Sequence, residues 1–280
     1  MTELRELAGG IGFTEGPLWT TDGRLLVTSV SRGLIYEVDL HGGAEVVAET
    51  GGGPNGLACD ADGTVWIAQN GGATGVSKST RPAAPGLQRL GDGVEDVLTE
   101  GCDAPNDLTL APDGRIWFTD PPSPFDDRPG RVCAYDPRTG ELSVLLDGLQ
   151  YPNGLAFGPD GAFYLAETRT TRILRYAWDG SALGPAEEFA VLREGRPDGI
   201  AFDADGNLYV AATSADAVLV FDAAGAEREP IAFDGPSMPT NVAFAGPALD
   251  VLVVTLGKGG RVLAVDGVAT GLSVLPAASR

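Results

Sequence analysis

An internal repeat runs through the whole chain and limits the folds open to it. Four segments share one pattern, at residues 54–68, 105–119, 152–166 and 197–211, and read PNGLACDADGTVWIA, PNDLTLAPDGRIWFT, PNGLAFGPDGAFYLA and PDGIAFDADGNLYVA. Two weaker copies stand at 15–29 (EGPLWTTDGRLLVTS) and 239–255 (PTNVAFAGPALDVLVVT). A period of about 40–50 residues is typical of propeller blades. The chain therefore contains six units of one architecture.

Each unit contains a β-hairpin signal. A short apolar run is followed by Asp-Gly or a looser turn, and then by a second run rich in Val, Ile, Trp, Tyr or Phe. Further strand-like runs bring the number to about four per repeat, while 40 Gly and 20 Pro argue against long helices. The sequence thus predicts an all-β fold over residues 1–280, a single six-bladed β-propeller domain with four-stranded antiparallel blades. Residues 3–8 should close it by pairing within the sixth blade beside the C-terminal strands.

One position of the repeat carries polar side chains of an unexpected kind. Counting back seven residues from the Asp of each Asp-Gly turn gives Glu15, Asn55, Asn106, Asn153 and Asp198, and the sixth unit gives Thr240 with Asn241 beside it. Rotation about the propeller axis should place these residues in a ring around the central channel. Their carboxylate and amide oxygens are hard ligands that suit calcium, magnesium or manganese. The ring therefore predicts a cation site.

The alternative for this position is a set of ordinary turns, because Asn and Asp in Pro-Asn-Gly and Pro-Asp-Gly bond their own backbone. Glu15 favours the metal interpretation, since glutamate has no special turn chemistry and buried charges are normally paired or bound to a metal. We expect Glu15, Asn153 and Asp198 to be ligands and Asn106 to be a fourth ligand or a water-mediated partner. Asn55 is the weaker candidate, and Thr240 is expected to be structural.

Composition excludes several classes of function. A formal net charge of −20 repels phosphate backbones and anionic lipids, and no apolar run is long enough to span a membrane, so neither nucleic acid nor membrane is expected as a partner. His41 is the single histidine and falls in a turn-like segment, which argues against a Ser-His-Asp triad or a histidine dyad. The first 20 residues lack the features of a signal peptide, so a cytoplasmic location is expected. A closed propeller without free edges is expected to be a monomer.

At these residues the sequence resembles the SMP-30/gluconolactonase/LRE-like family, and it is closer to the bacterial gluconolactonase branch than to regucalcin. The resemblance covers all six repeats and rests on the order of several strings: EGPLW at 15–19, PNDL at 105–108, FTDP at 118–121, YPNGLAF at 151–157 and PDGIA at 197–201. It implies one divalent cation in the channel on Glu15, Asn153 and Asp198. Calcium is the first expectation, with magnesium, manganese or zinc as alternatives. Asn106 falls where the family places a metal-proximal or substrate-contacting asparagine.

The resemblance also implies an activity, because family members include lactonases that act on sugar lactones. We therefore expect a metal-dependent hydrolase that opens a sugar lactone or a related small cyclic ester. Asp198 would be a ligand and the general base, and Asp107 a further catalytic residue. The expected substrate contacts are Asn106, Asn55, Asp120 and Glu167. For Asp107, Asp120 and Glu167 the alternative is that they only hydrogen-bond the backbone of the blades.

Two departures from the family pattern concern the substrate. The position at which the regucalcin branch carries a substrate-binding arginine is Ala104, and residues 122–125 (PSPF) stand where Tyr-Gly is common. The altered loop motivates a second hypothesis, in which the same metal site performs ring closure or isomerisation in a biosynthetic pathway. A third hypothesis is a binding propeller without catalysis. That hypothesis gives no reason for Glu, Asn and Asp to share one ring position.

Overall fold

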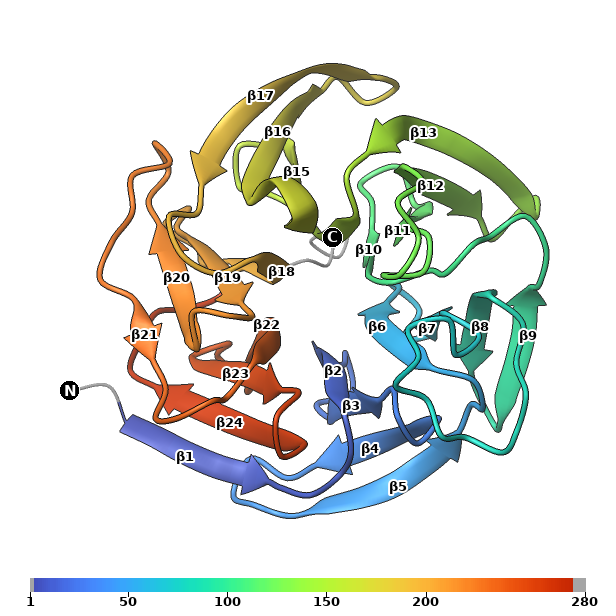
Figure 1. The fold of residues 1–280 in the computed structure, drawn as a ribbon, viewed down its shortest axis with the longest axis horizontal. Helices are drawn as coiled ribbons and strands as arrows, with labels where there is room; N and C mark the ends of the chain where they lie inside the picture. The colour runs from blue at the N-terminus through green and yellow to red at the C-terminus, as the bar shows by residue number, and fades with distance from the viewer. Residues whose placement is uncertain (1–2, 274–280) are drawn as a thin grey trace.

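The computed structural model describes residues 3–273 and confirms the six-bladed propeller. Six four-stranded antiparallel sheets follow one another around a ring, and Figure 1 shows them in order from blue to red about a central axis. The described residues contain no α-helix, and a single 3₁₀ turn spans Thr168–Thr170. Within the same residues no helix has the length and apolar character needed to cross a membrane.

Each sheet is a run of consecutive strands, with one exception at the closure. The first two sheets comprise β2 (Thr14–Trp19), β3 (Leu25–Ser29), β4 (Leu34–Val38), β5 (Ala44–Glu49), and β6 (Pro54–Cys59), β7 (Val65–Gln69), β8 (Gly86–Leu90), β9 (Val94–Leu98). The next two comprise β10 (Leu108–Leu110), β11 (Ile116–Asp120), β12 (Gly130–Asp136), β13 (Glu141–Leu149), and β14 (Pro152–Phe157), β15 (Phe163–Glu167), β16 (Arg172–Trp178), β17 (Leu183–Val191). The last two comprise β18 (Pro197–Phe202), β19 (Leu208–Ala212), β20 (Ala217–Phe221), β21 (Ile231–Ala232), and β22 (Pro239–Ala245), β23 (Val251–Leu256), β24 (Arg261–Asp266), β1 (Glu3–Ala8).

The predicted closure of the ring is confirmed by β1, which pairs antiparallel with β24. Glu3 stands opposite Asp266 and Arg5 opposite Ala264, and the Arg5 guanidinium donates to the Asp266 carboxylate at 2.6 Å. A second Arg5 nitrogen donates to the carbonyl oxygen of Leu40 in the first sheet. One arginine thus ties the N-terminal strand to both sheets that meet at the closure.

The core consists of apolar layers between neighbouring sheets rather than one central mass. The second strand of each blade is buried on both faces, as in β11, where Ile116, Trp117 and Phe118 are fully buried. Side chains that alternate along such a strand enter two different layers: Trp117 packs toward the fourth sheet and Phe118 toward the second. This double burial explains why these strands read as continuous apolar runs. The strands that surround the centre of the ring are the first strands of the sheets.

Trp117 gives a direct test of this layered core. Its ring contacts Phe157, Phe163 and Trp178 at centroid distances of 5.0–5.2 Å, and its indole N–H has no hydrogen-bond partner among the described residues. We expect Trp117→Ala to lower the free energy of unfolding by about 3–5 kcal/mol. Trp117→Phe should cost less than half of that, because it keeps an aromatic ring and removes the unpaired donor. Equal losses in chemical denaturation would contradict this account.

Candidate metal and catalytic site

The innermost strands of the six blades surround the axis, and five of them are irregular at their start. These strands are β2, β6, β10, β14, β18 and β22 (Figure 1). In β6, β14 and β18 the ladder to the next strand is interrupted between the opening proline and the third residue after it, and β2 and β22 carry similar shifts. A bulge of this kind frees the intervening residue from the ladder and re-aims its side chain. In β6, β14 and β18 the freed residues include Asn55, Asn153 and Asp198, whereas in β2 the shift begins directly after Glu15.

The structure buries all the predicted ring residues. Glu15, Asn55, Asn153 and Asp198 lie at the bulges of β2, β6, β14 and β18, Asn106 lies just before β10, and each is less than a tenth exposed. Thr240 of β22 differs: its hydroxyl donates to the carbonyl oxygen of Thr14 at 2.8 Å. Its side chain therefore links two neighbouring blades.

Three carboxylates face one another inside this ring. Burial, and then the charge of Asp107, raise the pKa of Glu15 to about 8. Burial also raises the pKa of Asp107 to about 6, and burial together with Glu15 raises that of Asp198 well above its ordinary value. The groups that lower these pKa values are backbone and side-chain amides, Asn153 for Asp198 and Asn241 for the other two. Among residues 3–273 no basic side chain contributes to these pKa values, so the ring is a buried concentration of negative charge.

These residues fit a hard divalent cation. Asn55 contributes a buried side-chain oxygen that has no hydrogen-bond partner among the described residues, and Asn153 lies against Asp198. Across residues 3–273 no three Asp, Glu, His or Cys side chains form a ligand cluster by themselves. A cation held here would therefore draw on amide oxygens and water besides carboxylates, which is the mixed donor set that calcium accepts.

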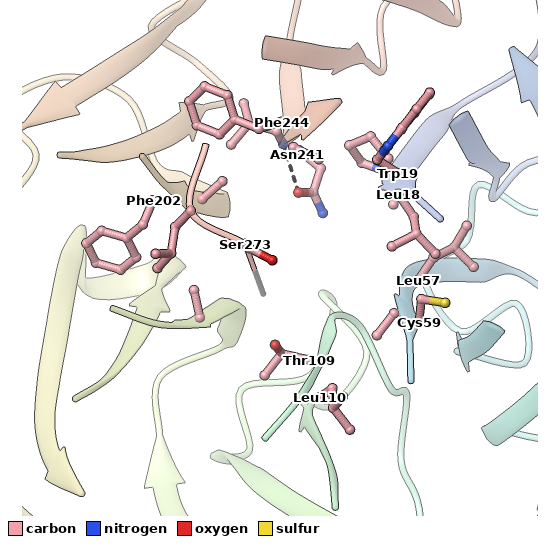
Figure 2. A pocket seen from close by; sticks show the side chains of 18 of the residues that line it. Leu18, Trp19, Leu57, Cys59, Thr109, Leu110, Phe202, Asn241, Phe244 and Ser273 are labelled. Carbon is pink, nitrogen blue, oxygen red and sulfur yellow. Dashed lines mark hydrogen bonds between the residues drawn. The ribbon is translucent and has the colours of Figure 1, made fainter. Parts of the chain in front are cut away.

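Asn241 is a residue of the site whose side-chain role was not predicted from the sequence. Its side-chain Nδ2 donates to Asp107 Oδ2 at 3.3 Å, and the same side chain lowers the pKa of Glu15. Its Oδ1 accepts from the backbone N–H of Val242 at 2.8 Å, which fixes the orientation of the amide (Figure 2). One amide from the sixth blade thus joins carboxylates from the first and third blades across the channel. The sequence did offer one signal: Asn241 and Asp107 occupy the position directly after the ring residue, and the other four units have glycine at that position.

Glycines at that register make room for these two side chains. A Cβ on Gly56 would lie 2.3 Å from Asp107 Oδ1, and a Cβ on Gly199 would lie 2.0 Å from Asn241 Oδ1. Both distances are too short for any side chain to be added without moving the polar group. Glycine is therefore required at positions 56 and 199, because Asp107 and Asn241 occupy the space that a side chain at these positions would need.

Gly199→Ala should displace Asn241 and loosen the site, because the added Cβ would lie 2.0 Å from Asn241 Oδ1 and 2.7 Å from its Cα. We expect it to weaken cation binding or lactone turnover by about 10- to 100-fold, the usual effect of losing a group that orients ligands. Gly91→Ala is the matched control, because a Cβ there would meet no atom within 4 Å. The measurement is calorimetric cation titration beside thermal unfolding, and equal behaviour of the two variants would contradict the proposed crowding.

Asp120 and Glu167 lie at the ends of β11 and β15, and their carboxylates already have partners. Asp120 accepts from Arg131 at 2.7 Å and from the backbone N–H of Ala104 at 2.8 Å. Glu167 accepts from the backbone N–H of Gln150 and from Arg172, both at 2.7 Å. Both acids therefore join the end of a strand to the loop that leads into its own blade. Their role in substrate binding stays a prediction.

Tyr151 also lies at the ring and stands in an unusual backbone conformation. Its φ is 60°, in the left-handed region that bulky residues rarely adopt. Burial and the charges of Asp198 and Glu15 raise the pKa of its phenol, which places the ring beside the carboxylates. The Arg169 guanidinium lies over the Tyr151 ring, 5.3 Å from the ring centroid. Tyr151 therefore presents a protonated hydroxyl at the site.

Comparison with known proteins agrees with the sequence resemblance. The chain matches the model of the SMP-30/Gluconolactonase/LRE-like region over residues 13–258. It belongs to this family. A pentonolactonase from Haloferax volcanii is 30% identical over 268 residues, which are 92% of this chain and 86% of the relative.

Two solved structures have the same fold. A gluconolactonase from Xanthomonas campestris is 27% identical and superposes with a TM-score of 0.80, over 95% of this chain and 89% of the other. A calcium-binding regucalcin from Agrobacterium tumefaciens is 22% identical, with a TM-score of 0.75 over 96% of this chain and 97% of the other. The similarity to the regucalcin structure shows a shared fold only.

Proposed function

We propose that this protein is a divalent-cation-dependent lactonase that opens a sugar lactone or a similar small cyclic ester. The observation that carries the proposal is the ring of buried, mutually repelling carboxylates and amide oxygens at the start of the inner strands. The family supports the reaction class, since two relatives of 27–30% identity are named for lactone hydrolysis. The cytoplasm as location and the monomer as assembly stay predictions.

The proposed cation ligands are Glu15, Asn153 and Asp198, with Asn106 as a fourth ligand or a partner through water. Calcium is the first candidate, because its site tolerates carboxylate, amide and water oxygens together. When held by these residues, a cation would supply Lewis acidity toward an ester carbonyl and would lower the pKa of water. The pKa values of Glu15 and Asp198 are raised when no cation is bound, so protons then reduce the repulsion between the two side chains. Binding of a cation would release these protons.

The chain's own residues supply the remaining steps. Asp198 accepts the proton of the attacking water as general base, a role in which a positioned carboxylate contributes about 10²–10⁴-fold. Asn153 lies against Asp198 and favours its ionised form, and the Asn241 amide donates to Asp107, so both carboxylates have an amide neighbour that supports their orientation. The Tyr151 hydroxyl and the Asn106 amide are the proposed donors to the lactone oxygens. Asn55 is a further candidate for contact with substrate.

A direct assay tests this function. Chelator-stripped protein is given calcium, magnesium, manganese or zinc singly, and acid release is followed from pentono- and hexonolactones and from a panel of aliphatic and aromatic lactones. We expect turnover to return with one of these cations, calcium first, and to follow one bound ion per chain. Absence of turnover on every lactone, despite one tightly bound cation, would contradict the proposal and favour a non-hydrolytic reaction at the same ring.

A further inference from the structure

The second strand ends in a polar side chain in the three blades whose ring residue is asparagine. These end residues are Gln69 of β7, Asp120 of β11 and Glu167 of β15, and each is at most 3% exposed. In the ladder Gln69 stands opposite Pro54 and Glu167 opposite Pro152, the residues directly before the ring asparagines. The three blades therefore place a buried polar group beside the start of the inner strand.

Each of these side chains accepts a hydrogen bond from the loop that leads into its own blade. Gln69 Oε1 accepts from the backbone N–H of Gly53 at 2.6 Å, two residues before Asn55. The Asp120 and Glu167 carboxylates likewise accept from backbone N–H groups two or three residues before their ring asparagines. In each blade one side chain thus fixes the backbone that leads directly to the ring asparagine.

The third strand of the blade holds each of these acceptors in turn. Gln69 Nε2 donates to Gln88 Oε1 of β8 at 3.1 Å, and Gln88 Nε2 donates to the carbonyl oxygen of Thr50 at 3.1 Å. In the third and fourth blades Arg131 and Arg172 take the place of Gln88. An uncharged pair of amides therefore has the same arrangement as two acid–arginine pairs. What the three blades share is the accepting oxygen, and not a negative charge.

The other three blades differ at this register, and so do their ring residues. Opposite the residue before the ring position they carry Ser29, Ala212 and Leu256. The Ser29 hydroxyl donates to the carbonyl oxygen of Ile11 at 2.6 Å, and the other two side chains have no polar atom. Ser31 and Asp216 accept from the entering loops of the first and sixth blades instead. The acceptor at the end of the second strand therefore coincides with asparagine at the ring.

This coincidence has a physical reason. A carboxylate is drawn toward a cation by its own charge, whereas a neutral amide contributes only if its oxygen already points the right way. Groups that surround a ligand supply this orientation through hydrogen bonds. The asparagines therefore need a support that Glu15 and Asp198 do not.

We propose that Gln69, Asp120 and Glu167 are positioning residues that hold the three ring asparagines in place, and that they act through an accepting oxygen rather than through charge. This inference rests on the proposed function, because that function assigns the asparagines to the cation and the substrate. It gives Glu167 an effect on the cation through Asn153, without contact between its carboxylate and the substrate.

Glu167 gives the sharpest test, because Asn153 is a proposed cation ligand. Glu167→Leu removes the acceptor and should weaken calcium binding by about 10- to 100-fold, the usual effect of losing a group that orients a ligand. Glu167→Gln keeps an acceptor and should restore most of the affinity in calorimetric titration. The Arg172 side chain, which is 37% exposed, can then be hydrated. If Glu167→Gln lost as much affinity as Glu167→Leu, the charge would be required and the proposal would be overturned.

A second background shows whether Glu167 acts through Asn153. In a chain that already carries Asn153→Ala, Glu167→Leu should have no further effect on calcium affinity, because no asparagine is left to position. Additive losses would overturn the proposal. If thermal unfolding shows that Glu167→Leu is damaged, Glu167→Met keeps the length of the side chain and takes its place.

Gln69→Leu extends the test to the blade without a charged acceptor. Because Asn55 is a proposed substrate contact, this variant should raise KM for the lactone by about tenfold and leave calcium affinity unchanged. Glu167→Leu should instead lower calcium affinity. A general structural defect would affect both quantities in both variants, and that result would contradict separate roles for the two blades.

The matched control is Glu187→Leu in the same blade as Glu167. Glu187 is exposed and pairs with Arg175 at 3.0 Å, so its loss removes an acid–arginine pair without touching the entering loop. Calcium affinity and lactone turnover should stay unchanged.

A readout without calcium or substrate separates this inference from the proposed function. The side-chain amide of Asn153 gives an NMR signal that is assigned by its absence in Asn153→Ala. Glu167→Leu should shift this signal in cation-free protein, and Glu187→Leu should leave it in place. An unshifted signal in Glu167→Leu would overturn the positioning role, whereas a parent chain that opens no lactone would contradict the proposed function alone.

Discussion

Replacing Asp198 by asparagine is expected to reduce lactone turnover by about 10³-fold and to weaken cation binding in the same protein. The change keeps the size of the side chain and removes its charge, so the proposed base and one proposed ligand are lost together. The carboxylate is buried against Glu15 and Asp107. Because Asp198→Asn removes this repulsion, the cation-free variant should unfold at a temperature no lower than the parent chain.

Asp205→Asn is the matched control for this prediction. Asp205 lies in the hairpin that follows the same strand, it is exposed, and its loss should leave turnover and cation affinity within a factor of two. The measurements are steady-state kinetics, calorimetric cation titration and thermal unfolding. If Asp198→Asn kept turnover within tenfold of the parent, Asp198 would not be the base.

Calcium is expected to stabilise the protein, and to do so more strongly as the pH rises from 5 to 8. In the cation-free protein the pKa of Glu15 is raised from 4.5 to about 8, so between these values the folded chain keeps a proton that the unfolded chain has lost. Stability of the cation-free protein therefore falls as the pH rises through this window. A bound cation replaces the proton and removes this loss. At one hundred times its dissociation constant the ligand adds about 2.7 kcal/mol.

The measurement is Tm against pH, with chelator and with calcium. Glu15→Gln should reduce the fall of Tm in chelator and remove most of the gain from calcium. The part of the fall that remains comes from Asp107 and Asp198, whose pKa values are also raised by burial. Carboxylates with a lowered pKa, such as Glu167 beside Arg172, stabilise the folded protein when they are ionised. Their contribution to stability is lost only as the pH falls below about 4.5. They leave the window from 5 to 8 unaffected. A Tm in chelator that rises from pH 5 to 8 would contradict the raised pKa of Glu15.

The sequence determined the architecture because the repeat unit is also the structural unit. Each blade buries its strands only against its two neighbours, so the pattern of one unit applies at every position around the ring. The same register placed Glu15, Asn55, Asn153 and Asp198 at equivalent bulges. Pairing of residues 3–8 with the last blade followed from the spare strand at the N-terminus.

Only the tertiary structure decided which residues meet across the closed ring. Asn241 and Asp107 are 134 positions apart and belong to opposite blades, so no local pattern could have predicted their hydrogen bond. Asp120 forms its ion pair with Arg131 of the adjacent strand, because the register of β11 and β12 places the two residues opposite each other. The cavity in the central channel likewise depends on small side chains from five blades that face one axis, namely Ala58, Thr109, Ala156, Ala201 and Ala243. Such features are properties of the closed assembly of blades, which no single repeat contains.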